Sequence, residues 1–183
     1  MKSNTDRFFV ITGGPGGGKT SLIAALHQQG YGCTVEAGRA IIQEQAATGG
    51  KALPWDDRAL FAELMLSWEI RSYHLAEESA GIVFFDRGVP DVLGYLRLVG
   101  LPIPGHMQKA AQLFGYYRRV FILPPWREIF SPDQERKQDF DEAIRTYAAM
   151  KAIYSEFGYE LIEIPPAPIE DRVQFVLHHA LSS

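Results

Sequence analysis

The eight residues G-G-P-G-G-G-K-T at 13–20 restrict the fold of this chain more than any other stretch of its sequence. Five glycines and a proline cannot continue a strand or a helix. The run nevertheless follows directly on the apolar pentapeptide F-F-V-I-T at 8–12, which predicts a short, buried strand. The helical pattern after the run stops at Gly30, a good helix end. The sequence therefore predicts a strand, a glycine loop and a helix in direct succession.

The glycine loop has the spacing G-x-x-x-x-G-K-[ST] through Gly13, Gly18, Lys19 and Thr20. Glycine-rich backbone lets successive N–H groups turn inward around a phosphate, and the following helix adds its N-terminal dipole. Lysine supplies a cation for the β- and γ-phosphates, and the threonine hydroxyl ligates Mg²⁺. These two residues favour phosphate binding over a flexible glycine hinge. We therefore predict that the loop binds a nucleoside triphosphate, and that the nucleotide-binding set also includes Gly14, Pro15, Gly16, Gly17 and Ser21.

Further along the chain, short apolar strands alternate with helical patterns. The expected strands are 31–35, 82–86, 119–123 and 159–164, and the expected helices are 38–47, 56–79, 90–99, 106–117, 140–157 and 169–181, with Asp56 as the cap of the long one. Alternation of this kind predicts an α/β fold with a parallel sheet covered on both faces. Ligands of such sheets lie beyond the carboxyl ends of the strands. We expect the functional residues there.

Length and charge limit the class of protein. The 183 residues are typical of one domain, and we expect a single domain over 1–183. A net charge of −4 gives no global basic field, so we expect neither nucleic acid nor membrane as a partner. A single cysteine cannot form an internal disulfide, and the polar start is followed by too short an apolar run for a signal peptide. These features predict a cytoplasmic protein.

Two classes of nucleotide-binding protein fit poorly. Motor ATPases of the extended AAA type need a strand that ends in Asp-Glu, whereas the strand here ends in Asp86-Arg87. GTPase switches read guanine through N-K-x-D, and Asn4 is the only asparagine in the chain. The D-V-L-G sequence at 91–94 has the D-x-x-G spacing, but it lies in an expected helix.

Four motifs span nearly the whole chain: G-G-P-G-G-G-K-T-S, E-A-G-R at 36–39, F-F-D-R-G at 84–88, and L-P-P-W followed by D-Q-E-R at 133–136. With these motifs the chain resembles the nucleoside and nucleotide kinase group of P-loop proteins. More narrowly, it resembles the AAA-type ATPase/kinase domains related to nicotinamide riboside kinase. The resemblance implies a three-layer P-loop NTPase fold with a five-stranded parallel sheet in the order 2-3-1-4-5.

The resemblance also implies roles for three residues near the strand ends. Glu36 falls where related nucleoside kinases place the base that accepts a proton from the attacking hydroxyl; the alternative is an exposed carboxylate favoured by a helix dipole. Asp86 ends an apolar strand, where a carboxylate needs a partner such as Mg²⁺ or the substrate hydroxyl, unless it is a structural cap. Arg87 would contact substrate or phosphate, or form a surface ion pair. Arg39 would face the same cleft.

The charged segment 126–139 predicts a short lid. Its arginines could clamp phosphate oxygens as charge develops, Arg136 as a catalytic residue and Arg127 as a nucleotide contact, although a solvated charge run would look the same. The resemblance further implies that the long helix lines the acceptor pocket. Candidate residues for that pocket are Arg71, His74 and Glu78, with Trp55 and Tyr73 as stacking rings.

Taken together, these features predict a phosphotransferase that moves the γ-phosphate of Mg-ATP to a hydroxyl of a small, nucleoside-like acceptor. Lys19 would hold the phosphates, Thr20 and Asp86 the Mg²⁺, and Glu36 or Asp86 would take the proton, while Arg87 and Arg136 neutralise developing charge. The alternative is a nucleotide-dependent regulatory ATPase without a small-molecule acceptor. A homodimer or a protein partner stays open in either case.

Overall fold

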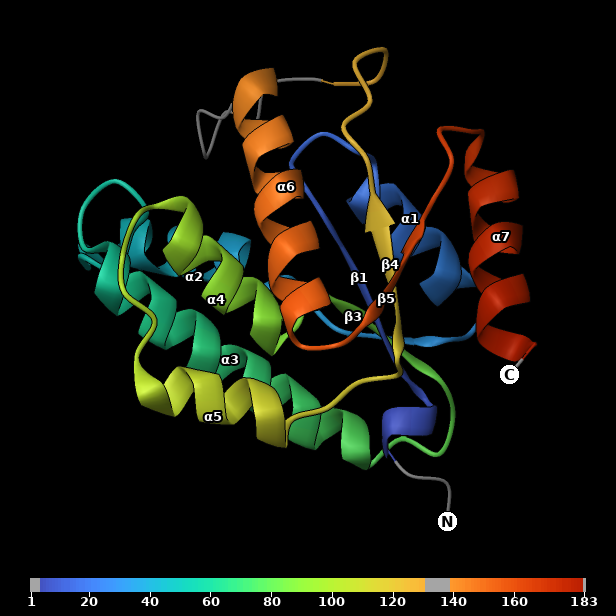
Figure 1. Cartoon of the computed structure of the whole chain (residues 1–183), viewed down its shortest axis with the longest axis horizontal. Helices are drawn as coiled ribbons and strands as arrows, with labels where there is room; N and C mark the ends of the chain where they lie inside the picture. Colours follow the sequence, from blue (N-terminus) through green and yellow to red (C-terminus); the bar gives the residue numbers. More distant parts are fainter. Residues whose placement is uncertain (1–3, 131–138, 183) are drawn as a thin grey trace.

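The computed structural model describes residues 4–130 and 139–182, and a parallel sheet lies at its centre (Figure 1). Its five strands are β1 (Phe8–Gly13), β2 (Gly32–Cys33), β3 (Val83–Asp86), β4 (Arg119–Leu123) and β5 (Glu160–Glu163). They pair in the order β2-β3-β1-β4-β5, all parallel, as predicted. The chain is thus an α/β protein with the predicted strand order, and β1 occupies the middle of the sheet.

Helices cover both faces of the sheet (Figure 1). One face packs against α1 (Lys19–Gln28) and α7 (Ile169–Leu181). The other packs against α3 (Arg58–Glu77), α4 (Val89–Leu98), α5 (Gly105–Leu113) and α6 (Phe140–Glu156), and α2 (Ala37–Thr48) packs on α3. A 3-10 turn at Asn4–Asp6 precedes β1. The three-layer architecture that the sequence predicts is therefore present.

The side chains of β1 show why its sequence is apolar without a break. Phe8 and Val10 belong to the core beneath α3–α6, whereas Phe9 and Ile11 belong to the core beneath α1 and α7. Successive residues of a strand point to opposite faces, so a central strand covered on both sides buries every residue. All six residues of β1 are buried. The glycine loop therefore begins at the end of a fully buried, central strand.

Several predicted boundaries differ from the structure by one or two residues, and three predictions are wrong for reasons that the structure shows. The second strand is Gly32–Cys33 rather than 31–35, because only these two residues pair with β3 and the N–H of Tyr31 donates to the carbonyl of Leu26 in α1. The helix predicted at 106–117 ends at Leu113, and the chain then leads into β4, with the N–H of Tyr117 donating to the carbonyl of Phe8 (2.7 Å). Asp57, not Asp56, caps α3: its carboxylate accepts from the N–H of Leu60 at 2.9 Å.

None of the helices in the described part of the chain combines the length and the apolar character needed to cross a membrane.

Candidate functional site

The glycine loop runs from the end of β1 to the first residue of α1, beyond the carboxyl ends of the strands. Gly18 precedes α1 with a φ of 79°, a left-handed conformation that glycine adopts without strain. A Cβ at Gly14 would overlap the carbonyl group of Ala143 in α6. The glycine at 14, which the motif spacing does not require, is thus explained by the close approach of the loop to α6.

The loop encloses an open cavity of about 600 Å³, called here the loop cavity. Its lining comprises residues 14–21, Arg39, Arg87, Ile129, Ile169 and Arg172. Because Gly18 has no side chain to cap α1, the N-terminal N–H groups of that helix remain available to an anion. Lys19 and three arginines add positive charge around the same space. The loop cavity therefore has the backbone and the charges of a phosphate-binding site.

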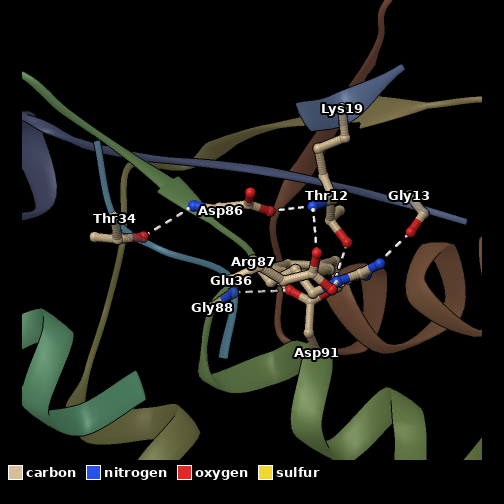
Figure 2. A network of polar contacts seen from close by, with 10 residues as sticks. Thr12, Gly13, Lys19, Thr34, Glu36, Asp86, Arg87, Gly88 and Asp91 are labelled. Carbon is tan, nitrogen blue, oxygen red and sulfur yellow. Dashed lines mark hydrogen bonds and ion pairs between the residues drawn. The ribbon is translucent and has the colours of Figure 1, made fainter. Parts of the chain in front are cut away.

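The predicted residues Lys19, Asp86 and Glu36 meet beside the loop (Figure 2). The Nζ of Lys19 forms a buried ion pair with the carboxylate of Asp86 and lies 3.6 Å from Oε2 of Glu36. Asp86 is also held through its backbone, since its N–H donates to the hydroxyl of Thr34 at 3.0 Å. Two carboxylates from the ends of neighbouring strands therefore share one cation in this structure.

Arg87 joins this network from the opposite side (Figure 2). Its Nε lies 3.4 Å from Oε1 of Glu36, and its Nη1 donates to the carbonyl of Gly13 at 3.0 Å. Burial lowers the pKa of the Arg87 guanidinium, but Glu36, Asp91 and Asp86 raise it to a net value above the ordinary one. Its φ of 74° is uncommon for a residue with a side chain, and such outliers cluster at functional sites. The ion pair of Arg87 is thus largely buried rather than on the surface.

Asp91, which the sequence analysis treated only as part of a D-x-x-G sequence, is a buried acceptor for four groups. It accepts from the hydroxyl of Thr12, the N–H of Gly88 (2.9 Å), the hydroxyl of Tyr154 (2.5 Å) and Nη1 of Arg87 (3.3 Å). These groups come from β1, the turn after β3, and α6. The available signal was its place three residues after Gly88 in the first turn of α4, where an acidic side chain bonds back to the preceding backbone.

A second cavity, of about 220 Å³, lies between α2, α3, α4 and α6 and is called here the helix-lined pocket. Its lining is mainly apolar, with a few polar groups. It includes Phe61, Met65 and Glu69 from α3, Asp91, Val92 and Tyr95 from α4, Glu142, Thr146 and Met150 from α6, together with Glu36, Trp55 and Arg58. Pro15 and Arg87 line both cavities. The two spaces therefore adjoin at the glycine loop.

The long helix contributes to this pocket, but through other residues than those predicted. Arg71 lines a separate groove beside β2, and the ring of His74 contacts Glu77 at 2.8 Å. Glu78 is the exposed residue that follows α3. Tyr73 lies in the core, where its hydroxyl donates to the carbonyl of Gly115 at 2.8 Å, whereas Trp55 does line the pocket. The prediction that Arg71, His74 and Glu78 line the acceptor pocket is thus wrong.

Glu69 is the pocket residue of α3 that sequence reasoning missed. It is only 3 % exposed, and burial, followed by the Asp91 charge, raises its pKa well above the ordinary range. Phe61, Met65 and Glu69 stand at successive i+4 positions, so they share one face of the helix. A carboxylate that continues an apolar stripe was the signal in the sequence.

The structure treats the two arginines of the predicted lid, Arg127 and Arg136, differently: it describes only the first of them. Arg136, and with it most of the segment 126–139, lies outside the described residues. Arg127 stacks on the ring of Phe140, with 4.0 Å between the guanidinium carbon and the ring centroid, and is not part of the loop-cavity lining.

Arg172 of α7 lines the loop cavity but was missed in the sequence. Its Nη1 donates to the carbonyl of Gly17 at 3.3 Å, and its Nε has no hydrogen-bond partner within the described residues. A basic residue in the first turn of a helix opposes the dipole, which was the available signal.

The donors near the loop fit a magnesium ion that is bound mainly through phosphates. The hydroxyl-bearing Thr20 lines the loop cavity, and the carboxylate of Asp86 contacts Lys19, which lines the same cavity. Mg²⁺ prefers such oxygen ligands and commonly takes only one or two from the protein beside substrate phosphates and water. Within residues 4–130 and 139–182, no group of three or more His, Cys, Asp or Glu side chains could hold a metal ion.

A buried strand, a glycine loop that closes in Lys19 and Thr20, and a helix N-terminus define a P-loop protein. The model of the AAA domain family matches residues 8–172, so the chain belongs to that family. The Asp86-Arg87 end of β3 nevertheless lacks the glutamate that follows the strand in AAA motor ATPases. Comparison with curated protein sequences gave no match.

Several solved structures share the fold. Deoxyadenosine kinase from M. mycoides with bound dATP has a TM-score of 0.66 at 13 % identity, over 96 % of this chain and 100 % of that one. The NadR protein in complex with NR has a TM-score of 0.70 at 18 % identity, and the match covers 98 % of this chain but 52 % of that one. Shikimate kinase from Acinetobacter baumannii in complex with shikimate has a TM-score of 0.56 at 17 % identity, and the match covers 98 % of this chain and 95 % of that one. The chain thus has the fold of P-loop kinases.

Proposed function

We propose that this protein is a phosphotransferase that moves the γ-phosphate of Mg-ATP to a hydroxyl of a small, nucleoside-like acceptor. The observation that carries the proposal is the junction of the two cavities at Pro15 and Arg87. One cavity has the charges of a phosphate site, and the other is a small apolar pocket with a few polar groups, as ligand sites commonly are. A hydrolase without an acceptor has no need of the second cavity.

We propose Glu36 as the group that accepts the proton. The acceptor oxygen forms a bond to the γ-phosphorus, the bond from that phosphorus to the bridging oxygen of ADP breaks, and the hydroxyl proton passes to a carboxylate. Glu36 lines the helix-lined pocket and contacts both Lys19 and Arg87. Asp86 does not line that pocket and is bound to Lys19. We therefore favour Glu36 over Asp86 as the base.

The remaining residues position and stabilise charge. The backbone N–H groups of the loop and the Lys19 ammonium bind the β- and γ-phosphates, which requires Lys19 to exchange its carboxylate partners for phosphate oxygens. Thr20 and Asp86 would hold Mg²⁺, which supplies charge neutralisation at the phosphates. Arg87 lines both cavities, so its guanidinium can reach oxygens on either side of the transferring group.

The test is ADP release from Mg-ATP across nucleosides, nucleoside monophosphates, nicotinamide riboside and sugars. We expect one compound to raise the rate by orders of magnitude and to leave the reaction carrying the phosphate, detected by mass spectrometry. A flat panel over a slow basal rate, with ATP still raising the Tm, would reject the phosphotransferase and support a nucleotide-dependent regulatory ATPase. Absence of any ATP effect on the Tm would reject nucleotide binding as well.

A further inference from the structure

Three polar groups of the helix-lined pocket take no part in the proposed phosphoryl transfer. The carboxyl group of Glu69 has no hydrogen-bond or ion-pair partner within the described residues, although the residue is only 3 % exposed. The hydroxyls of Tyr95 and Thr146 are fully buried and likewise lack a partner there. Buried polar groups are normally hydrogen-bonded in folded proteins, so each of these requires an explanation.

The three groups face one space from three different helices. Glu69 lies on α3, Tyr95 on α4 and Thr146 on α6, and all of them line the helix-lined pocket. Isolated unsatisfied groups could be packing defects. Three that converge on one cavity point instead to a ligand that supplies their partners, since a site built for hydrogen bonding leaves its own groups unpaired when empty.

The rest of the pocket favours a flat, apolar body for that ligand. Phe61, Met65 and Met150 contribute apolar surface, and the rings of Phe61 and Tyr95 meet edge to face with centroids 5.4 Å apart. The cavity volume of about 220 Å³ is small for a ligand site and suits a small ring system. Aromatic and thioether side chains pack well on such rings.

The charges around Glu69 decide which hydrogen bonds it can make. Burial raises the pKa of Glu69, and so do the carboxylates of Asp91, Asp86 and Glu36, while Arg87 lowers it. The phenol of Tyr116 also interacts with Glu69, and its own pKa is raised by burial. Because the net shift is upward, burial and the neighbouring carboxylates favour the protonated form of the Glu69 side chain. A protonated carboxyl group both donates and accepts, as do the hydroxyls of Tyr95 and Thr146.

We propose that Glu69, Tyr95 and Thr146 select an uncharged heteroaromatic ring whose edge carries a hydrogen-bond donor next to an acceptor. Amide-like and amidine-like edges, such as those of inosine and of adenosine or cytidine, have this pattern and can pair with a neutral carboxyl group through two hydrogen bonds. The inference rests on the proposed function in one respect, namely that this pocket holds the acceptor. It goes further in naming the ring chemistry and the residues that recognise it.

Direct binding tests the proposal without turnover. Calorimetry in the absence of ATP would measure Kd for adenosine, cytidine, inosine, purine riboside, which lacks the donor, and cationic nicotinamide riboside. We expect at least one of the first three to bind tenfold or more tightly than purine riboside or nicotinamide riboside. Repeating the titration in two buffers of different ionisation enthalpy should show no proton release. Tighter binding of the cationic ring with release of a proton would overturn the proposal, and so would the absence of binding by all five compounds.

Variants separate recognition from structure. Glu69→Gln retains a donor and an acceptor, so we expect its Kd within a few-fold of the wild type, whereas Glu69→Leu should weaken binding at least tenfold. Tyr95→Phe and Thr146→Val should each weaken it several-fold. Tyr147→Phe is the control, because Tyr147 is on the same helix as Thr146, but its hydroxyl donates to Glu163, outside the pocket. Equal Kd values for the Gln and Leu variants, each with a cooperative thermal unfolding transition, would overturn the role of Glu69.

The outcomes also distinguish this inference from the proposed function. Binding of a neutral ring that depends on Glu69, with a flat ADP-release panel, would retain the ring site and reject phosphoryl transfer. Acceleration of ADP release by a sugar alone, with no ring compound bound, would retain the phosphotransferase and reject the ring site.

Discussion

The loop cavity and the helix-lined pocket touch at Pro15 and Arg87, yet the chain builds them in opposite ways. Most of the loop cavity comes from eight consecutive residues, 14–21, and its lining side chains are rich in cations. The helix-lined pocket draws on four helices, and its charged lining is mostly acidic, with Glu36, Glu69, Asp91 and Glu142 against Arg58 and Arg87. Under the proposed function, backbone N–H groups would recognise the phosphates in the loop cavity, whereas side chains would select the acceptor in the helix-lined pocket.

This difference suggests a division of labour. Phosphate binding needs N–H groups and a cation at fixed spacing, which a local sequence can encode. Selection of an acceptor needs shape and a few hydrogen bonds, which can change by substitution on any of the surrounding helices without disturbing the loop. Changes in the first cavity should therefore affect turnover with every substrate, while changes in the second should affect some substrates only.

The largest effect is expected for Lys19→Ala. Loss of the cation at the transferring phosphate should lower turnover by about 10³–10⁵-fold, the range that a charge-stabilising residue contributes to phosphoryl transfer. The variant also leaves the buried carboxylates of Asp86 and Glu36 without their shared cation, which costs about 3–5 kcal/mol when a buried pair is broken. ADP release and thermal unfolding measure the two effects.

A double variant separates these effects. Lys19→Met combined with Asp86→Asn should recover much of the lost Tm, because it removes one of the uncompensated charges, while turnover stays lost. Full activity of Lys19→Ala would contradict the loop assignment.

Exchange of single carboxylates should decide between the two candidate bases. Glu36→Gln should lower kcat by about 10²–10⁴-fold, as loss of a general base does, with the Kd for ATP changed only a few-fold. Asp86→Asn should instead raise the Mg²⁺ concentration needed for half-maximal turnover. Steady-state kinetics against Mg²⁺ and acceptor distinguish the two patterns, and the reverse result would assign the base to Asp86.

Asp91 lines the helix-lined pocket and accepts a hydrogen bond from Arg87, which lines both cavities, so removal of Asp91 should loosen both. Asp91→Ala removes one of the acceptors of the Arg87 guanidinium and leaves the buried hydroxyls of Thr12 and Tyr154 without the carboxylate to which they donate. A loss of about 3 kcal/mol or more is expected, with a Tm lower by about 2–4 °C for each kcal/mol. Glu156→Ala is the matched control, because its partner Arg97 lies on the surface, where a pair contributes about 0–1 kcal/mol. Equal Tm values for the two variants would contradict this role of Asp91.

The smallest effect concerns Glu69 and pH. Its pKa in the fold is raised by burial above the ordinary 4.5, so folded and unfolded chains are equally protonated below that value. As the pH rises past 4.5, the unfolded chain loses its proton first, and stability falls until the folded pKa is reached. Glu69→Gln does not titrate. It should therefore gain Tm over the wild type at pH 7–8, by at least about 2 °C if the effect reaches 1 kcal/mol, and show no gain near pH 4.

Glu156 is the control for this pH profile, because its pKa is shifted in the opposite direction. The pKa of Glu156 is lowered by its hydrogen bond to Arg97, so that residue stabilises the fold above the ordinary pKa and loses this contribution as the pH falls. Glu156→Gln should accordingly differ from the wild type near neutral pH rather than in acid. A pH-independent Tm difference for Glu69→Gln would show that the Glu69 carboxyl group is not held neutral.

The sequence by itself determined the sheet, its strand-helix alternation and the glycine loop. These features depend on neighbours in the chain: continuous apolar runs for the buried strands, glycines for the turns, and Lys19-Thr20 for the helix that starts there. It also identified Glu36, Asp86 and Arg87, which the fold brings into one network because the carboxyl ends of parallel strands share one edge.

Only the tertiary structure decided which face of α3 meets α4 and lines the pocket. The sequence shows Glu69, Arg71 and His74 as polar residues of one helix. The i+4 spacing places Glu69 on the stripe of Phe61 and Met65, but it does not say which helices that stripe meets. Packing placed Glu69 in the pocket and Tyr73 in the core. Asp91 and Arg172 likewise acquire partners more than sixty residues away in the chain. Contacts of that range follow from how the helices pack on the sheet, which no local pattern encodes.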